Sequence, residues 1–259
     1  MEQRYRRELL LNRLEEIGRS LERTGRGLAL IALGSVGLEL ERLDEFSDLD
    51  FFAIVEPGSK ESFLGDLAWL SSIRPIAFCF RNTDDGYKLL FDDGVFCEFA
   101  VFVPAELGAI PFAPGRVLWK RPEVDGTIGV PVRALPRPEP RPVEWLVGEA
   151  LTNLYVGLCR WRRGEHLSGS RFIQQLAVDR VLELVPLLEA AAGGAVDAFS
   201  GERRFEQRYP FAARRLSGFI QGYDRSPQSA AAVLDFLEEH FEVNGAMARA
   251  IRALMRAQH

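Results

Sequence analysis

The sequence predicts an α+β fold, in which a mixed β-sheet flanked by helices is followed by a C-terminal α-helical bundle. In the first half of the 259-residue chain, short apolar segments rich in β-branched and aromatic residues alternate with helical segments. Five prolines then fall between residues 130 and 142, a composition typical of an extended connector. Beyond them the apolar residues recur with helical spacing. We therefore expect an N-terminal domain at residues 1–130, a linker at 131–142 and a helical domain at 143–259.

The N-terminal domain is expected to begin with an amphipathic helix at residues 2–24, where apolar residues form one helical stripe: Leu10, Leu14, Ile17 and Leu21. Four strands are expected after it, at residues 28–33, 49–55, 73–80 and 95–103. A helix is expected at residues 61–72, between the second and third strands. In the C-terminal domain, helices are expected at residues 144–166 and 170–194, followed by two or three further amphipathic segments.

Composition limits the class of protein. Hydrophobic residues make up 47% of the chain, enough for a sizeable core, and the net charge of −5 does not favour a protein that grips nucleic acid. A small anionic ligand such as a nucleotide remains compatible with that charge. Cys79, Cys97 and Cys159 form no CxxC pair and are predicted to be buried free thiols. No apolar run reaches the roughly 18 residues of a membrane span, and the charged N-terminus does not resemble a signal peptide. We expect a cytoplasmic protein.

Two carboxylates stand at the start of the apolar strand expected at residues 49–55. In a strand, residues i and i+2 project to the same face, so Asp48 and Asp50 would lie side by side. Two like charges so close are favourable when a divalent cation lies between them, and Mg²⁺ is commonly held by one or two carboxylates and substrate phosphates. The alternative is a solvent-exposed turn, in which aspartate is common.

Gly34 and Ser35 follow the first expected strand and precede a segment able to form a helical turn. A glycine there lets the backbone approach a phosphate, while backbone N–H groups and the serine hydroxyl supply donors. Together with the two aspartates, this arrangement favours a site for a nucleoside triphosphate and its metal.

Glu98 is the only charged residue in the apolar segment at residues 95–103. An ionised carboxylate in such a strand is costly unless a cation meets it, so Glu98 is predicted to be a metal ligand, a general base or both. The alternative is a glutamate at a strand edge that faces solvent.

These residues resemble the motif of the nucleotidyltransferase superfamily that includes DNA polymerase beta: a Gly-Ser pair, then SDLD at the head of a strand, then an acid on a later strand. Within it the chain is most similar to the lincosamide and aminoglycoside nucleotidyltransferases, and the RGEH segment at residues 163–166 adds to the likeness. The resemblance implies that Gly34, Ser35 and Ser47 bind the nucleotide. It further implies that Asp48, Asp50 and Glu98 are catalytic and hold Mg²⁺, with Glu98 deprotonating the acceptor.

The reaction implied by the resemblance is Mg²⁺-dependent transfer of a nucleoside monophosphate, AMP from ATP, to a hydroxyl of a small molecule such as a lincosamide or an aminoglycoside. Glu165 and His166 are then expected to contact the acceptor, although a charge cluster at a solvent-exposed helix end explains them equally well. The resemblance also implies a homodimer.

Two other functions are compatible with the sequence. The first is a regulatory or antitoxin-like protein of the nucleotidyltransferase fold that binds or modifies a protein partner. The second is a non-enzymatic α/β protein with a helical bundle, in which the three acids hold no ion. The three acids and the helical domain of more than 100 residues, at 143–259, favour the small-molecule enzyme over the first of these. The second requires that Glu98 face solvent.

Overall fold

The computed structural model describes residues 2–133, 135, 139–193, 197 and 200–256, and the side chains from residue 5 onward. The chain divides into two compact units, Met1–Pro136 and Arg137–His259, which we call the sheet unit and the helical unit. The division falls within the segment predicted as a linker, of which residues 134 and 136–138 lie outside the described part. Residues 1, 194–196, 198–199 and 257–259 of the two predicted domains also lie outside it.

The sheet unit contains a six-stranded sheet with the strand order β3-β4-β5-β2-β1-β6. Its strands are β1 (Gly27–Ala32), β2 (Leu49–Val55), β3 (Ile76–Arg81), β4 (Gly86–Phe91), β5 (Phe96–Phe102) and β6 (Arg116–Lys120). Strands β2 and β5 pair in parallel, and the neighbouring strands on either side of them pair antiparallel. The predicted α+β fold with a mixed sheet is therefore confirmed.

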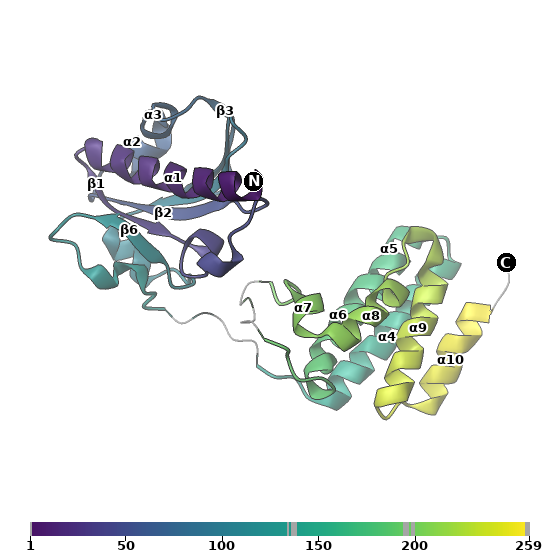
Figure 1. Ribbon diagram of the computed structural model, residues 1–259. Coiled ribbons are helices and arrows are strands. Elements are labelled where there is room, and N and C mark those ends of the chain that lie inside the picture. The colour runs from purple at the N-terminus through teal and green to yellow at the C-terminus, as the bar shows by residue number, and fades with distance from the viewer. Residues whose placement is uncertain (1, 134, 136–138, 194–196, 198–199, 257–259) are drawn as a thin grey trace. The chain divides into compact units, whose positions relative to one another are not determined.

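One face of the sheet is covered by helices α1 (Glu2–Arg23), α2 (Lys60–Gly65) and α3 (Ala68–Ser71), and Figure 1 shows α1 lying across the strands. The predicted stripe of α1 is fully buried against this face, where the alternate side chains Leu49, Phe51, Ala53 and Val55 of β2 form the main core with it. The opposite face carries a smaller core that includes Ile54, Phe102 and Leu107. Side chains of even number on β2 thus point away from α1.

Several sequence predictions differ from the structure in detail. Strands β4 and β6 were not predicted, because each mixes polar and apolar residues without a clear alternation. The helix expected at residues 61–72 is two short helices, since Asp66 interrupts it and accepts a hydrogen bond from the backbone N–H of Ala68. The third strand begins at Ile76 and not at residue 73, after Pro75, which has no backbone N–H to donate.

The prediction that Cys79 is buried is wrong. Cys97 is buried as predicted and Cys159 is half-buried, but Cys79 is exposed. The apolar composition of its segment indicated a central strand, whereas β3 lies at the edge of the sheet and five of its six residues are exposed.

The helical unit is built around a separate core formed only by its own residues. Its helices are α4 (Val143–Arg162), α5 (His166–Arg171), a π-helix at Phe172–Ala177, α6 (Val178–Leu184), α7 (Phe205–Arg208), α8 (Pro210–Phe219), α9 (Ser226–His240) and α10 (Gly245–Arg256). Helices α4 and α5 approach each other so closely that a Cβ atom on Gly169 would lie 2.8 Å from the carbonyl oxygen of Gly157. The helix expected at residues 170–194 is in fact this succession of α5, π-helix and α6, ending in a 3₁₀ turn at Val185–Leu187.

In the part of the chain that the structure describes, no helix combines the length and the apolar character that crossing a membrane requires.

Candidate active site

Three charged side chains form a continuous row across neighbouring strands of the sheet unit. Asp50 on β2 is the register partner of Glu98 on β5, and Glu98 is in turn the partner of Lys88 on β4. Partners on adjacent strands project to the same face of a sheet. The three side chains therefore lie side by side on the face opposite α1, and the sheet register brings together two of the predicted site residues.

Lys88 neutralises Glu98 in this row. Its Nζ atom lies 2.8 Å from Glu98 Oε1, and both side chains are partly exposed. The hydrogen bond to Glu98 and the charge of Glu98 raise the pKa of Lys88, and the charges of Asp48 and Asp50 raise it further. All three predicted acids thus act on one ammonium group, which places Asp48 in the same electrostatic cluster.

Asp48 and Asp50 flank Leu49, the fully buried first residue of β2. Asp48 immediately precedes the strand, and both aspartates are half-buried. Because Leu49 points into the main core, the two aspartates are directed to the opposite face. The prediction that they share a face follows from this alternation.

The Gly-Ser turn lies against Asp50. Gly34 and Ser35 begin a 3₁₀ turn at Gly34–Val36, directly after β1, and the backbone N–H of Leu33 donates to the carbonyl oxygen of Asp50 over 2.8 Å. Gly34 has a φ of +55°, and a Cβ atom there would lie 3.3 Å from Asp50 Oδ2. Glycine is therefore favoured at this position both by the backbone conformation and by the nearby carboxylate.

Arg116 and Gly37 stabilise this turn, and Arg116 was not identified from the sequence as a site residue. The guanidinium of Arg116 on β6 donates to the carbonyl oxygens of Val36 and Gly37, at 2.9 and 3.2 Å. A Cβ atom on Gly37 would lie 2.7 Å from the carbonyl oxygen of Ala32, so the chain can fold back this tightly only with glycine. The signal for Arg116 was missed because β6 itself was not predicted.

Ser47 belongs to the turn that precedes Asp48. Its hydroxyl donates to Asp44 Oδ1 and accepts from the backbone N–H of Asp44, each over 3.0 Å. The structure thus shows Ser47 shaping the approach to β2, and its contact with a nucleotide stays a prediction.

Some of the oxygen atoms in the charged row are of the kind that Mg²⁺ binds. Asp48 and Asp50 offer hard carboxylate oxygens at the open end of β2, the kind of ligand that Mg²⁺ takes together with phosphate oxygens and water. Within the described residues, no group of three or more His, Cys, Asp or Glu side chains is arranged to hold a metal ion. Glu98 is engaged by Lys88, so its role as a third ligand stays a prediction.

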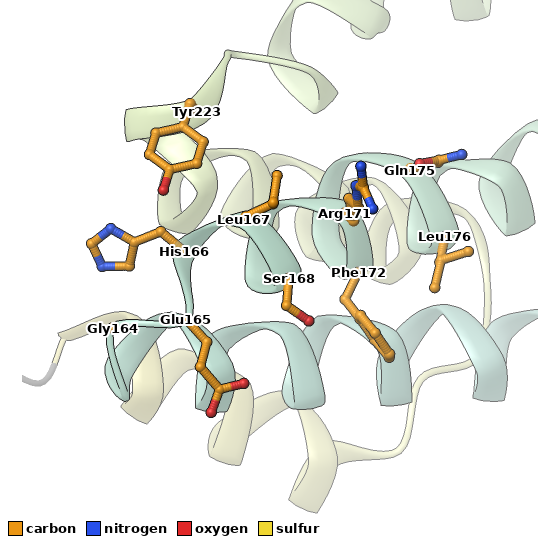
Figure 2. A pocket seen from close by; sticks show the side chains of 10 residues that line it. All are labelled: Gly164, Glu165, His166, Leu167, Ser168, Arg171, Phe172, Gln175, Leu176 and Tyr223. Carbon is orange, nitrogen blue, oxygen red and sulfur yellow. The ribbon is translucent and has the colours of Figure 1, made fainter.

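Glu165 and His166, predicted to contact an acceptor, lie in the helical unit at the turn between α4 and α5. They line a pocket of about 600 Å³ together with residues of α5, the π-helix and the 3₁₀ turn at Tyr223–Arg225. The His166 ring stacks on Trp161 with centroids 4.0 Å apart, and Glu165 Oε1 lies 2.8 Å from Arg163 Nε. Figure 2 shows His166 and Tyr223 at one end of this pocket and Gln175 and Leu176 at the other.

Gln174 positions one wall of this pocket. Its side-chain amide donates to the carbonyl oxygen of Gly222 and to Ser226 Oγ, and accepts from the backbone N–H of Gly222. These bonds connect the π-helix to the segment that carries Tyr223. A π-helix is uncommon and often found at functional sites, but the sequence pattern does not distinguish it from an α-helix.

Comparisons with known proteins add little to this geometry. No protein-family model matches the chain, and no curated protein matches it. Among solved structures, the chain is similar to an aminoglycoside 6-adenyltransferase from Bacillus subtilis, at 14% sequence identity over 95% of this chain and 91% of that chain, with a TM-score of 0.32. A likeness at that TM-score carries no argument about activity.

Proposed function

We propose that the protein is a Mg²⁺-dependent nucleotidyltransferase of the DNA polymerase beta-like superfamily. In this proposal it transfers AMP from ATP to a hydroxyl group of a small molecule such as a lincosamide or aminoglycoside. The observation that supports it best is the row in which Asp50 and Glu98 are register partners on β2 and β5, with Gly34 against Asp50. In this proposal the turn binds phosphate, the two aspartates hold the metal, and Glu98 is the third acid.

Asp48 and Asp50 hold the metal in this proposal, and the backbone N–H groups of the turn at Gly34–Val36 orient the triphosphate. Bound Mg²⁺ would neutralise the charge that develops on the phosphate oxygens, the main requirement of this chemistry. Arg116 keeps the turn in place through its two hydrogen bonds to carbonyl oxygens.

Glu98 takes the proton of the acceptor. The hydroxyl oxygen forms a bond to the α-phosphorus of ATP, the bond from that phosphorus to the bridging oxygen of the β-phosphate breaks, and pyrophosphate leaves. The hydroxyl proton passes to Glu98, for which we assign the oxygen Oε2, because Oε1 accepts the hydrogen bond of Lys88. Lys88 fixes the position of the Glu98 carboxylate through this hydrogen bond.

The same proposal includes contacts of Glu165 and His166 with the acceptor. It also includes the homodimer that the resemblance implies. The 600 Å³ pocket that contains both residues has the size of a small-molecule site.

The first test is the Asp50→Asn variant. It keeps the shape of the side chain but removes the charge, so we expect the melting temperature to stay close to that of the wild type. Transfer of AMP to a panel of lincosamides and aminoglycosides, followed by mass spectrometry of the acceptor, is expected to fall at least about a hundredfold. Asp48→Asn should behave in the same way.

Asp66→Asn is the matched control, because Asp66 is exposed on the helix-covered side and an asparagine retains the oxygen that caps Ala68. It should leave AMP transfer unchanged. Full activity of a folded Asp50→Asn protein would overturn the proposal. Thermal stabilisation by ATP and Mg²⁺, with no modification of any small acceptor, would favour the regulatory or antitoxin-like function instead.

A further inference from the structure

An aromatic side chain next to the predicted metal-binding pair has no role in the site described so far. Phe46 lies two residues before Asp48, and at 87% it is the most exposed large apolar side chain in the part of the chain that the structure describes. Asp44 Oδ1 accepts hydrogen bonds from the backbone N–H of Phe46, over 2.9 Å, and from the hydroxyl of Ser47, over 3.0 Å. These bonds fix the backbone of the turn that carries the exposed ring.

The proposed function assigns the two sides of Asp50 along the charged row. The turn at Gly34–Val36 follows β1, Glu98 belongs to β5, and these two strands are the neighbours of β2 in the sheet. The triphosphate would thus lie on the β1 side and the acceptor hydroxyl on the β5 side. This order suits an in-line displacement, in which the attacking and leaving oxygens lie on opposite sides of the phosphorus. The ribose and base must then extend across the row and not along it.

One of the two directions across the row is blocked. Phe52 is the next residue of β2 on the same face after Asp50, toward the end of the strand. Its ring lies against Phe102 and Phe112, with centroids 5.0 and 5.4 Å apart, and both of these residues are buried in the smaller core. A ribose and a base cannot occupy this side of the row, because the three rings fill it.

The other direction leads toward the start of β2 and Phe46. Most of the connection between β1 and β2 lies on the helix-covered side of the sheet, since Val36 and Leu43 are buried in the main core and Leu40 packs against it. The carbonyl oxygen of Leu40 also accepts a hydrogen bond from Arg7 of α1, over 3.0 Å. This part of the connection therefore leaves the start of β2 to the ribose and base.

Resting on the proposed function, we propose that Phe46 stacks on the base of the bound nucleoside triphosphate. The Cα atoms of Phe46 and Asp48 lie at most about 7 Å apart, which is comparable to the span of a ribose between the α-phosphate and the base. A nucleobase is uncharged, so the acids of the site do not oppose its approach to the ring. Stacking of this kind uses the flat face of a base, and an exposed aromatic side chain supplies the surface for it.

The test compares two ligands by isothermal titration of the full-length protein in the presence of Mg²⁺. ATP carries the base, whereas inorganic tripolyphosphate has neither the base nor the ribose. We expect Phe46→Ala to bind ATP at least about fivefold more weakly than the wild type and to bind tripolyphosphate with the same affinity. The melting temperature should not change, because the side chain is almost fully exposed.

Phe211→Ala is the matched control, since Phe211 is 53% exposed but belongs to α8 of the helical unit. It should leave the affinity for ATP unchanged. Phe46→Trp gives a second readout, because it keeps a flat ring at this position and adds a fluorophore. The fluorescence that this variant has in excess of the wild type should be quenched by ATP and not by tripolyphosphate.

Equal affinity of Phe46→Ala and the wild type for ATP would overturn this inference. So would an equal loss of affinity for ATP and tripolyphosphate, which would show that Phe46 acts on the phosphate site through the shape of the turn. An increase in the KM of the acceptor with unchanged ATP binding would assign Phe46 to the acceptor instead.

The same titrations separate this inference from the proposed function. If the wild type binds both ATP and tripolyphosphate and Phe46→Ala changes neither, only the role of Phe46 is wrong. If the wild type binds neither ligand, the nucleotidyltransferase function fails, and the role of Phe46 fails with it.

Discussion

At the scale of single residues, Gly34 sets how closely the Gly-Ser turn approaches Asp50. Its φ of +55° is left-handed, which costs an L-residue roughly 1–2 kcal/mol, and a Cβ atom would lie 3.3 Å from Asp50 Oδ2. Gly34→Ala should therefore displace the carboxylate as well as strain the backbone. We expect the protein to bind Mg²⁺ and ATP at least tenfold more weakly in isothermal titration.

Gly58→Ala is the control for that variant. Gly58 has a φ of +81°, and a Cβ atom there would meet no heavy atom within 4 Å, so the substitution introduces a comparable backbone strain without touching the site. It should lower stability to a similar extent and leave nucleotide binding intact. Equal loss of binding in both variants would show that Gly34 acts through backbone conformation and not through Asp50.

At the scale of elements, one ion pair attaches α1 to the turn between β4 and β5. Arg13 is 4% exposed, and its Nη2 atom lies 2.6 Å from Asp93 Oδ2. Burial alone would raise the pKa of Asp93, but hydrogen bonds from Arg13 and from the backbone N–H of Val95, with the charges of Arg13 and Arg74, lower it overall. A lowered folded-state pKa means that the stabilisation is present above the ordinary value and lost as the pH falls below it.

Asp93→Asn should therefore lower the free energy of unfolding by about 2 kcal/mol at pH 7. The difference from the wild type should shrink as the pH falls from about 5 to about 3, measured by urea denaturation across that range. Glu16→Gln is the comparison, because Glu16 contacts Arg13 from the same helix, three residues away, and should cost only a few tenths of a kcal/mol. A pH-independent difference for Asp93→Asn would contradict this account.

The elements that could be predicted from the sequence are those in which the order of apolar residues follows directly from which side chains are buried. The apolar stripe of α1 is the one buried face of that helix. The segment LDFFAIV forms β2 with the expected bounds, and most of its side chains are buried. The segment IAFCFR has the composition of a buried strand but forms the exposed edge strand β3. Edge position is decided by which strands pair, and the composition of one segment does not encode it.

The same limit applies to the candidate site. Asp48, Asp50, Gly34 and Glu98 were identifiable because each departs from the apolar pattern around it. Lys88 and Arg116 were not, because one depends on the register of β4 against β5 and the other on the pairing of β6 with β1. Long-range register follows from side-chain packing and turn geometry together.

At the scale of the whole molecule, the two units have separate hydrophobic cores. Every buried residue of the large core of the helical unit comes from that unit, and the two cores of the sheet unit draw only on residues of its own. We expect two calorimetric transitions. Leu14→Ala, in α1, should shift one of them and Leu154→Ala, in α4, the other, each side chain being fully buried and costing about 3 kcal/mol. A single transition shifted by both variants would contradict this expectation.

The parallel pairing of β2 with β5 also determines when the charged row can exist. The strands β1 and β2 pair antiparallel, as do β3, β4 and β5 in succession, so each group can form from neighbouring parts of the chain. Asp50 belongs to the first group, and Glu98 and Lys88 belong to the second. The row is completed only when β5 closes the long loop back to β2. During synthesis, therefore, the chain gains its three-acid cluster only after β5 has emerged, however early β1 and β2 have folded.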